Sequence, residues 1–84
     1  MKVEYLLDIL KPHQPSVDLV ARTLMEIKGV SSVRISVDEL DQKTASLHIR
    51  IVGANLSFDE VTEKLSLMNC ALHSVDEVVC EEFD

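Results

Sequence analysis

The sequence predicts an α+β fold of the ferredoxin-like type, a βαββαβ sandwich in which two helices cover one face of a four-stranded antiparallel sheet. Two observations predict it. Strand-like segments with apolar residues at every second position and segments with helical spacing follow one another in the order β-α-β-β-α-β. The pattern of the first half also recurs in the second half, at an offset of 41 or 42 residues. The topology gives the strand order 4-1-3-2, and residues 1–84 are predicted to form one domain.

The first half contains a strand, a helix and a second strand. Residues 3–10 alternate, with apolar residues at Val3, Tyr5, Leu7 and Ile9. Residues 16–29 have the 3-4-3 spacing of one helical face, at Val17, Val20, Leu24 and Ile27. Ser16 is a predicted N-cap of this helix and Gly29 its C′ residue. Residues 32–37 form the next strand, with Val33, Ile35 and Val37 on one face.

The second half repeats these elements. Residues 45–52 alternate at Ala45, Leu47, Ile49 and Ile51. Residues 57–69 have the helical spacing 3-4-3 at Phe58, Val61, Leu65 and Met68, after a capping box formed by Ser57 and Glu60. Residues 73–80 supply the last strand, in which the apolar positions are Val75, Val78 and Val79. Glu77 interrupts that pattern, which leaves the register of this strand open.

The opposite face of the sheet is predicted to be open and mixed in polarity. A three-residue turn at residues 41–43 would place Arg34 directly opposite Arg50, an unfavourable pair of like charges unless an acid lies between them. Glu4, Asp8 or a neighbouring subunit could supply that acid. One interpretation is a solvated lattice of ion pairs; the other is an oligomer contact, since the outward residues include Leu6, Leu10 and Val52.

Composition excludes several classes of protein. The net charge is −7, from 8 basic and 15 acidic residues, and no basic cluster is present, so nucleic acid is not an expected partner. No apolar run is long enough for a membrane span and no secretion signal follows Lys2, so we expect a cytoplasmic protein. Cys70 and Cys80 lie too far apart along an extended segment to form a disulfide.

Motifs of the common enzyme classes are also missing. There is no glycine-rich phosphate loop, no H-E-x-x-H, no C-x-x-C and no G-x-S-x-G. Cys70 and His73 could form a nucleophile and base, but no orienting group accompanies them, and a buried, inert Cys70 is the simpler interpretation. We therefore expect a protein that is not an enzyme.

Metal binding is the chemistry that the sequence favours most. The topology brings the loop with His13 and the start of the last strand with His73 to the same end of the sheet, where Asp76 could join them in a zinc-type site. Alternatively, oxygen ligands from Asp8, Asp76 and Glu77, or from the acids of the hairpin, could hold calcium or magnesium. A third interpretation is that both histidines cap strand ends and the acids are solvated.

Three stretches carry a resemblance to a known family. LDILKPHQPSV near the start, VRISVDELD in the middle and LHSVDEVV near the end resemble the archaeal domain-of-unknown-function family 211, in order and at compatible spacing. The matching positions include Asp8, His13, His73, Asp76 and Glu77. The resemblance implies a ferredoxin-like fold, an archaeal cytosolic setting, ring-like homo-oligomers and a divalent cation, with calcium expected ahead of zinc. Gln14 stands where the family commonly has an acidic residue, which removes one candidate cation ligand.

These observations predict a non-enzymatic, ring-like homo-oligomeric binding protein that takes a divalent cation such as calcium. At 84 residues, the small core that one chain can form also favours oligomerisation. The alternative is a regulatory domain similar to the ACT domains, which share this fold and bind a small metabolite between subunits. That alternative depends on the fold analogy alone.

Overall fold

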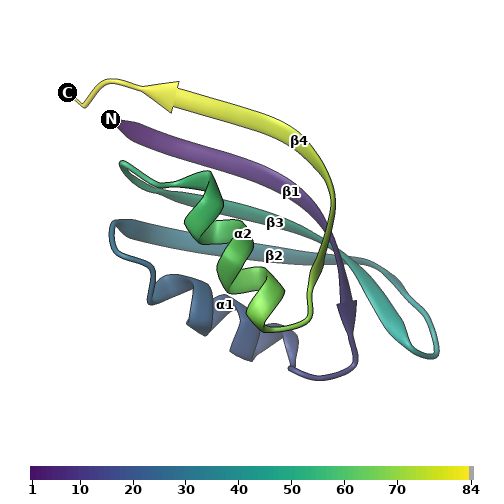
Figure 1. The fold of residues 1–84 in the computed structure, drawn as a ribbon. Helices are drawn as coiled ribbons and strands as arrows, with labels where there is room; N and C mark the ends of the chain where they lie inside the picture. Colours follow the sequence, from purple (N-terminus) through teal and green to yellow (C-terminus); the bar gives the residue numbers. More distant parts are fainter. Residues whose placement is uncertain (84) are drawn as a thin grey trace.

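The structure, a computed structural model, describes residues 1–83. Its elements are β1 (Lys2–Pro12), α1 (Val17–Met25), β2 (Val30–Leu40), β3 (Thr44–Ala54), α2 (Phe58–Leu67) and β4 (Ala71–Glu81). The four strands form one antiparallel sheet in the order β2-β3-β1-β4. Both helices lie on the same side of the sheet, and the start of β1 lies beside the end of β4 (Figure 1). The predicted ferredoxin-like α+β fold and its strand order are confirmed.

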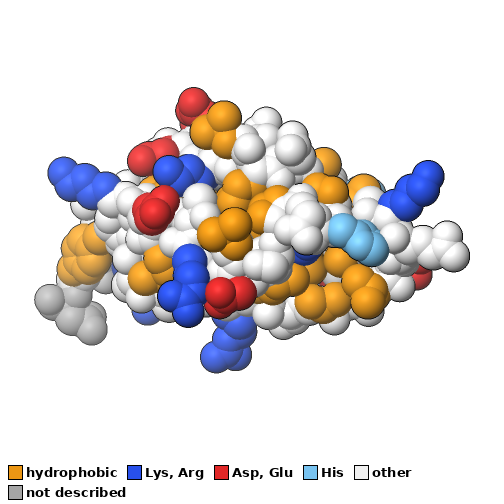
Figure 2. Space-filling view, turned by 90° about the horizontal axis from the view of Figure 1, so that it is seen from below, with side chains coloured by type: hydrophobic (Ala, Val, Ile, Leu, Met, Phe, Trp, Pro, Cys, Tyr) orange, Lys and Arg blue, Asp and Glu red, His pale blue; other side chains and the backbone are white. Residues whose placement is uncertain are grey.

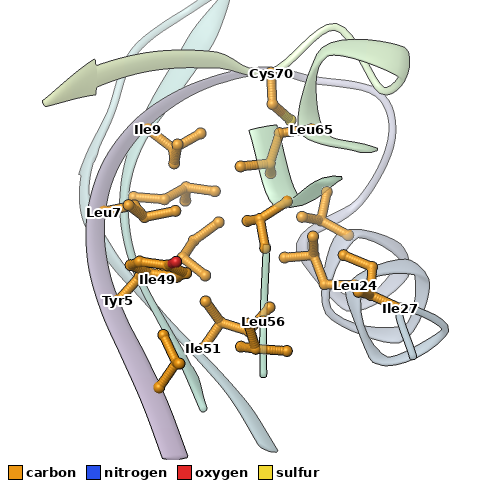
Figure 3. Close-up of a cluster of buried hydrophobic side chains, with 14 of the residues drawn as sticks. Tyr5, Leu7, Ile9, Leu24, Ile27, Ile49, Ile51, Leu56, Leu65 and Cys70 are labelled. Atoms are coloured by element: carbon orange, nitrogen blue, oxygen red, sulfur yellow. The ribbon is translucent and has the colours of Figure 1, made fainter. Parts of the chain in front are cut away.

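The core lies between the helices and the odd-numbered positions of the two central strands. Leu7, Ile9, Leu47, Ile49 and Ile51 are fully buried on the sheet side. In Figure 3, the labelled side chains of the sheet point toward those from the helices and their flanking turns. Full burial of each such side chain contributes about 1.5–3 kcal/mol, so this face determines which way the central strands are turned.

The helices begin where the sequence predicts, but the first one ends early. Ser16 Oγ accepts from the Leu19 amide at 3.1 Å and Ser57 Oγ from the Glu60 amide at 3.3 Å, so both predicted N-caps are confirmed. The prediction that Gly29 is the C′ residue of α1 is wrong, because α1 ends at Met25. Gly29 has φ +94° and lies against β3, where an added Cβ would be 2.4 Å from the Ala54 carbonyl oxygen. It permits close approach of two backbone segments.

The hairpin between β2 and β3 has the predicted register from Val33 to Val37, between two irregularities of β2. Val33 pairs with Ile51, Ile35 with Ile49 and Val37 with Leu47. The turn occupies residues 41–43, and the Asp41 amide donates to the Thr44 carbonyl at 2.8 Å. Arg34 therefore lies opposite Arg50, as the sequence predicts.

Strand β4 departs from simple alternation. Its pairing with β1 steps from Glu77 directly to Val75, which leaves Asp76 as the extra residue of a bulge. Val75 and Val78 lie opposite Leu7 and Tyr5 and so share the helix side. Val79 lies opposite Glu4 on the open face, because the bulge shifts the alternation by one residue and so sets the register that the sequence left open.

Within the described residues, neither helix has the length and apolar character needed to cross a membrane.

Candidate metal centre

Four polar side chains form a row across the open face of the sheet. Ser36 in β2 pairs with His48 in β3, His48 pairs with Asp8 in β1, and Asp8 pairs with Ser74 in β4. Residues paired in this way point to the same face, with Cα atoms about 4.5–5.5 Å apart. The row therefore puts an imidazole and a carboxylate next to each other in the centre of the sheet.

Bulges on the two edge strands add two more carboxylates. In β2 the pairing steps from Val37 to Glu39, so Asp38 is an extra residue there, as Asp76 is in β4. A bulge bends its strand and changes the direction of the extra side chain. Asp38 and Asp76 both reach His48, from opposite edges of the sheet. Each edge strand thus supplies one acid to a histidine in the centre.

The two ring nitrogens of His48 have different carboxylate partners. Nδ1 contacts Asp38 Oδ2, and Nε2 lies 3.1 Å from Asp76 Oδ2. Partial desolvation lowers the pKa of His48, but the charge of Asp38 and the hydrogen bonds with Asp76 and Asp38 outweigh it and raise the pKa above its usual value. A neutral imidazole has only one N–H, so it cannot donate to both acids. With Nδ1–H donating to Asp38, the lone pair of Nε2 faces Asp76, where a metal cation can take the place of the second proton.

Asp8 completes this group. One donor atom each from Asp8, His48 and Asp76 lies within 4.8 Å of the others. Ligand atoms bind zinc or calcium at about 2.0–2.6 Å, so donors on opposite sides of one ion are roughly 4–5 Å apart. Ser74 Oγ donates to Asp76 Oδ1 at 2.7 Å and holds that carboxylate in place. A histidine oriented through Nδ1–H by a carboxylate is a common arrangement at metal sites. The three residues fit one divalent cation.

A hollow adjoins the group on the side of the β2–β3 hairpin. Its volume is about 370 Å³, and its lining residues are Asp8, Ile9, Leu10, Asp38, Glu39, Ser46 and His73. His73 is the extra residue of a second irregularity in β4, between Ser74 and Leu72. It lines this hollow together with Asp8 but is not one of the three residues with clustered donor atoms.

His13 lies in the loop between β1 and α1. The loop is organised by Lys11, which is only 4% exposed and whose Nζ donates to the carbonyls of Pro12, His13 and Pro15 at 2.7, 3.3 and 2.8 Å. The His13 side chain is not among the clustered donors.

Glu77 is exposed, with Oε1 3.9 Å from Arg50 Nη1. Of the five predicted ligands, the structure thus brings Asp8 and Asp76 together, and it adds His48.

His48 was not among the predicted ligands, although the sequence holds a signal for it. Alternation places Asp8 and His48 on the same open face. Their direct pairing depends on the register between β1 and β3, which no hairpin turn sets, since these strands are joined through α1 and β2. The position of Asp76 beside them depends on a bulge that periodicity does not reveal.

The cysteines lie apart from this group. Both are free thiols. Cys70 is 5% exposed, and burial raises its pKa despite the opposing effect of the Lys11 charge. A raised pKa keeps the thiol protonated at neutral pH, and the thiolate is the reactive form.

Residues 4–83 match the model of domain-of-unknown-function family 211, described as "Uncharacterized ArCR". The chain belongs to this family. It is also 41% identical over 73 residues to a protein of Methanocaldococcus jannaschii, "Uncharacterized protein MJ0319", an alignment that covers 87% of this chain and 75% of that protein. The resemblance seen in the three sequence stretches is confirmed. Family 211 carries no described activity, so the site has to be interpreted from its own geometry.

Proposed function

We propose that this family 211 protein is a non-enzymatic, homo-oligomeric protein that binds a divalent cation on the open face of its sheet. The observation that carries the proposal is the convergence of Asp8, His48 and Asp76, with donor atoms within 4.8 Å of one another. They come from three strands, and Asp38 and Ser74 orient two of them. Ligands on strands are held more precisely than ligands on loops.

The donor set favours a transition-metal ion. One imidazole nitrogen with two carboxylates suits Zn²⁺ or Mn²⁺, whereas Ca²⁺ takes six to eight oxygen ligands and rarely uses nitrogen. We therefore place Zn²⁺ and Mn²⁺ ahead of the Ca²⁺ that the family resemblance suggests. Three protein ligands also leave coordination positions for water or for another ligand.

The homo-oligomer is supported by an apolar strip that the helices leave uncovered. On the helix side of β4, Leu72, Val75 and Val78 are 38%, 41% and 56% exposed. Figure 1 shows β4 running along the edge of the sheet beyond both helices. The face seen from below, in Figure 2, also has hydrophobic patches between separate charged side chains. An uncovered apolar strip beside an unpaired strand edge is a surface that a second copy can bury.

Binding rather than catalysis is supported by the state of Cys70. It is the one cysteine in a loop with a nearby histidine in the sequence, and its burial and raised pKa make it a poor nucleophile.

Native mass spectrometry of the purified protein, before and after chelation, tests the proposal. We expect a discrete oligomer that carries one cation per chain and loses it on chelation. His48→Gln should abolish cation retention, while the matched variant His13→Gln should retain it. A metal-free monomer under both conditions would contradict the proposal, and so would equal cation retention by the two variants.

A further inference from the structure

A second group of residues lies next to the metal centre on the same open face. A shallow hollow of about 430 Å³ is lined by Leu6, Arg34, Ser36, Asp38, His48 and Arg50. It shares His48 with the cation group described above, and it also includes Asp38, which contacts His48 Nδ1. The other polar lining groups are two guanidiniums and one hydroxyl, which are all able to donate hydrogen bonds to an anion.

The two guanidiniums are not neutralised equally. Arg34 and Arg50 are directly paired between β2 and β3. Arg50 donates to Glu4 Oε2 and lies 3.9 Å from Glu77, but both of these acids lie on the far side of Arg50 from Arg34, in β1 and β4. Among the described residues Arg34 has no ion-pair partner. A like-charged cross-strand pair is destabilising by itself, so an anion placed at Arg34 would relieve it.

The arginine row and the metal row are neighbours. Arg34–Arg50 and Ser36–His48 are successive pairs on the same face, two residues apart along each strand. Two residues of a strand span roughly 7 Å. A phosphate group between the two rows can direct some of its oxygen atoms to the arginines and others to the cation. Guanidinium is suited to phosphate because its fixed fork of donors matches two phosphate oxygens.

From this arrangement we infer that the open face binds a phosphate group, as free phosphate or as a phosphate ester, between Arg34 and Arg50 on one side and the cation held by Asp8, His48 and Asp76 on the other. This inference rests on the proposed cation site. The phosphate would fill the open coordination positions of the cation. It would also accept hydrogen bonds from Arg34 and from the Ser36 hydroxyl.

The two ligands should depend on each other. Asp38 lines the hollow, and Asp8 and Asp76 cluster with His48, which also lines it, so these carboxylates repel an anion when no cation is bound. A divalent cation offsets this repulsion. The coupling is reciprocal, so phosphate should raise the affinity for the cation by the same factor.

Isothermal titration calorimetry of the full chain with methyl phosphate, in the absence and presence of Mn²⁺, tests the inference. We expect phosphate binding at least about tenfold tighter with Mn²⁺ than without it. Arg34→Gln should weaken phosphate binding by about tenfold or more, the effect of losing a charge-assisted contact, and leave Mn²⁺ binding alone unchanged. Arg34→Lys should restore part of the loss, since it keeps the charge without the fork.

Arg22→Gln is the matched control, because it removes the same charge from the exposed face of α1, where Arg22 pairs only with Asp18. It should change neither affinity. Mn²⁺ binding without phosphate binding would overturn this inference and leave the cation site standing. Phosphate binding that ignores Mn²⁺ or Arg34→Gln would overturn it as well. Absence of Mn²⁺ binding with and without methyl phosphate would overturn both this inference and the proposed function.

Discussion

The two faces of the same sheet are organised by different forces. On the helix side, Leu7 and Ile49 pair within a fully buried apolar layer. On the open side, one residue further along, Asp8 and His48 pair within a network of charges. The helix side is stabilised by the burial of apolar surface area, which many apolar sequences can provide. The second face depends on particular atoms, and the bulges at Asp38 and Asp76 are what bring those atoms together.

The largest contrast should come from neighbouring residues of β3 that face opposite sides. Ile49→Ala should lower the free energy of unfolding by about 2–5 kcal/mol, because it leaves a cavity in the fully buried layer. His48→Ala should cost much less than this in cation-free buffer, because it leaves no cavity in the core. Urea denaturation measures both. If Ile49→Ala leaves too little folded protein, Ile49→Val should still cost about 0.5–1.5 kcal/mol. Equal losses in the free energy of unfolding at the two positions would contradict the contrast between the two faces.

A change beside the metal ligands should affect binding and not folding. Ser74→Ala removes the hydroxyl that donates to Asp76 Oδ1. We expect cation affinity to fall about tenfold, in line with the loss of an orienting partner at other metal sites. Calorimetric titration with Zn²⁺ measures this affinity. Ser66→Ala, on the exposed surface of α2, is the control and should leave it unchanged. A wild-type affinity in Ser74→Ala would mean that Asp76 needs no orientation or is not a ligand.

Charge balance on the open face should contribute a smaller amount. Glu4→Gln removes the carboxylate that contacts Arg50, so the Arg34–Arg50 pair loses its nearest acid. The free energy of unfolding should fall by no more than about 1 kcal/mol, because Arg50 is 37% exposed, and by less in 1 M salt. Asp18→Asn breaks a pair whose side chains are 76% and 77% exposed, and any loss should reflect only the weak interaction of Asp18 with Arg22 and with the first turn of α1. A loss that persists in high salt would point to packing of Glu4.

The smallest effect should be the pH dependence of the cation-free protein. The pKa of His48 is raised in the fold, so protonated His48 stabilises the folded state fully below the unfolded pKa of about 6.5. This contribution is lost as pH rises through the higher folded pKa. With chelator present, thermal unfolding should therefore show a slight loss of stability above about pH 6.5 that His48→Gln removes. If His48→Gln shows the same pH dependence of stability, that dependence comes from groups other than His48.

The sequence predicts the buried face better than the open one. The residues at odd positions, the repeat at half the chain length and the short turn at residues 41–43 together predict the topology and the β2–β3 register, and these are confirmed. The reason is physical: apolar burial leaves a periodic pattern in the sequence. The sequence predicts the end of α1 wrongly and leaves the register of β4 open, because a close backbone contact at Gly29 and a bulge at Asp76 leave no such pattern.

For the site, the sequence supplies residues but not their partners. Asp8 and Asp76 were candidates for their residue type, and His48 was known only as an outward-facing residue. What joins them is the register between β1 and β3 together with two bulges. His13 and His73 were expected together because their loops share one end of the sheet. In the fold, the His13 loop is tied to Lys11, and His73 faces the adjoining hollow.

The most direct test of the cation site uses the three histidines as reporters in one experiment. In a ¹⁵N-resolved NMR titration with Zn²⁺, the His48 Nε2 resonance should shift at one equivalent, as direct ligation requires. The resonances of His13 and His73, which lie outside the clustered donors, should stay in place. A shift of the His13 or His73 resonance with His48 unchanged would contradict the account. It would place the cation near the β1–α1 loop or the start of β4 instead.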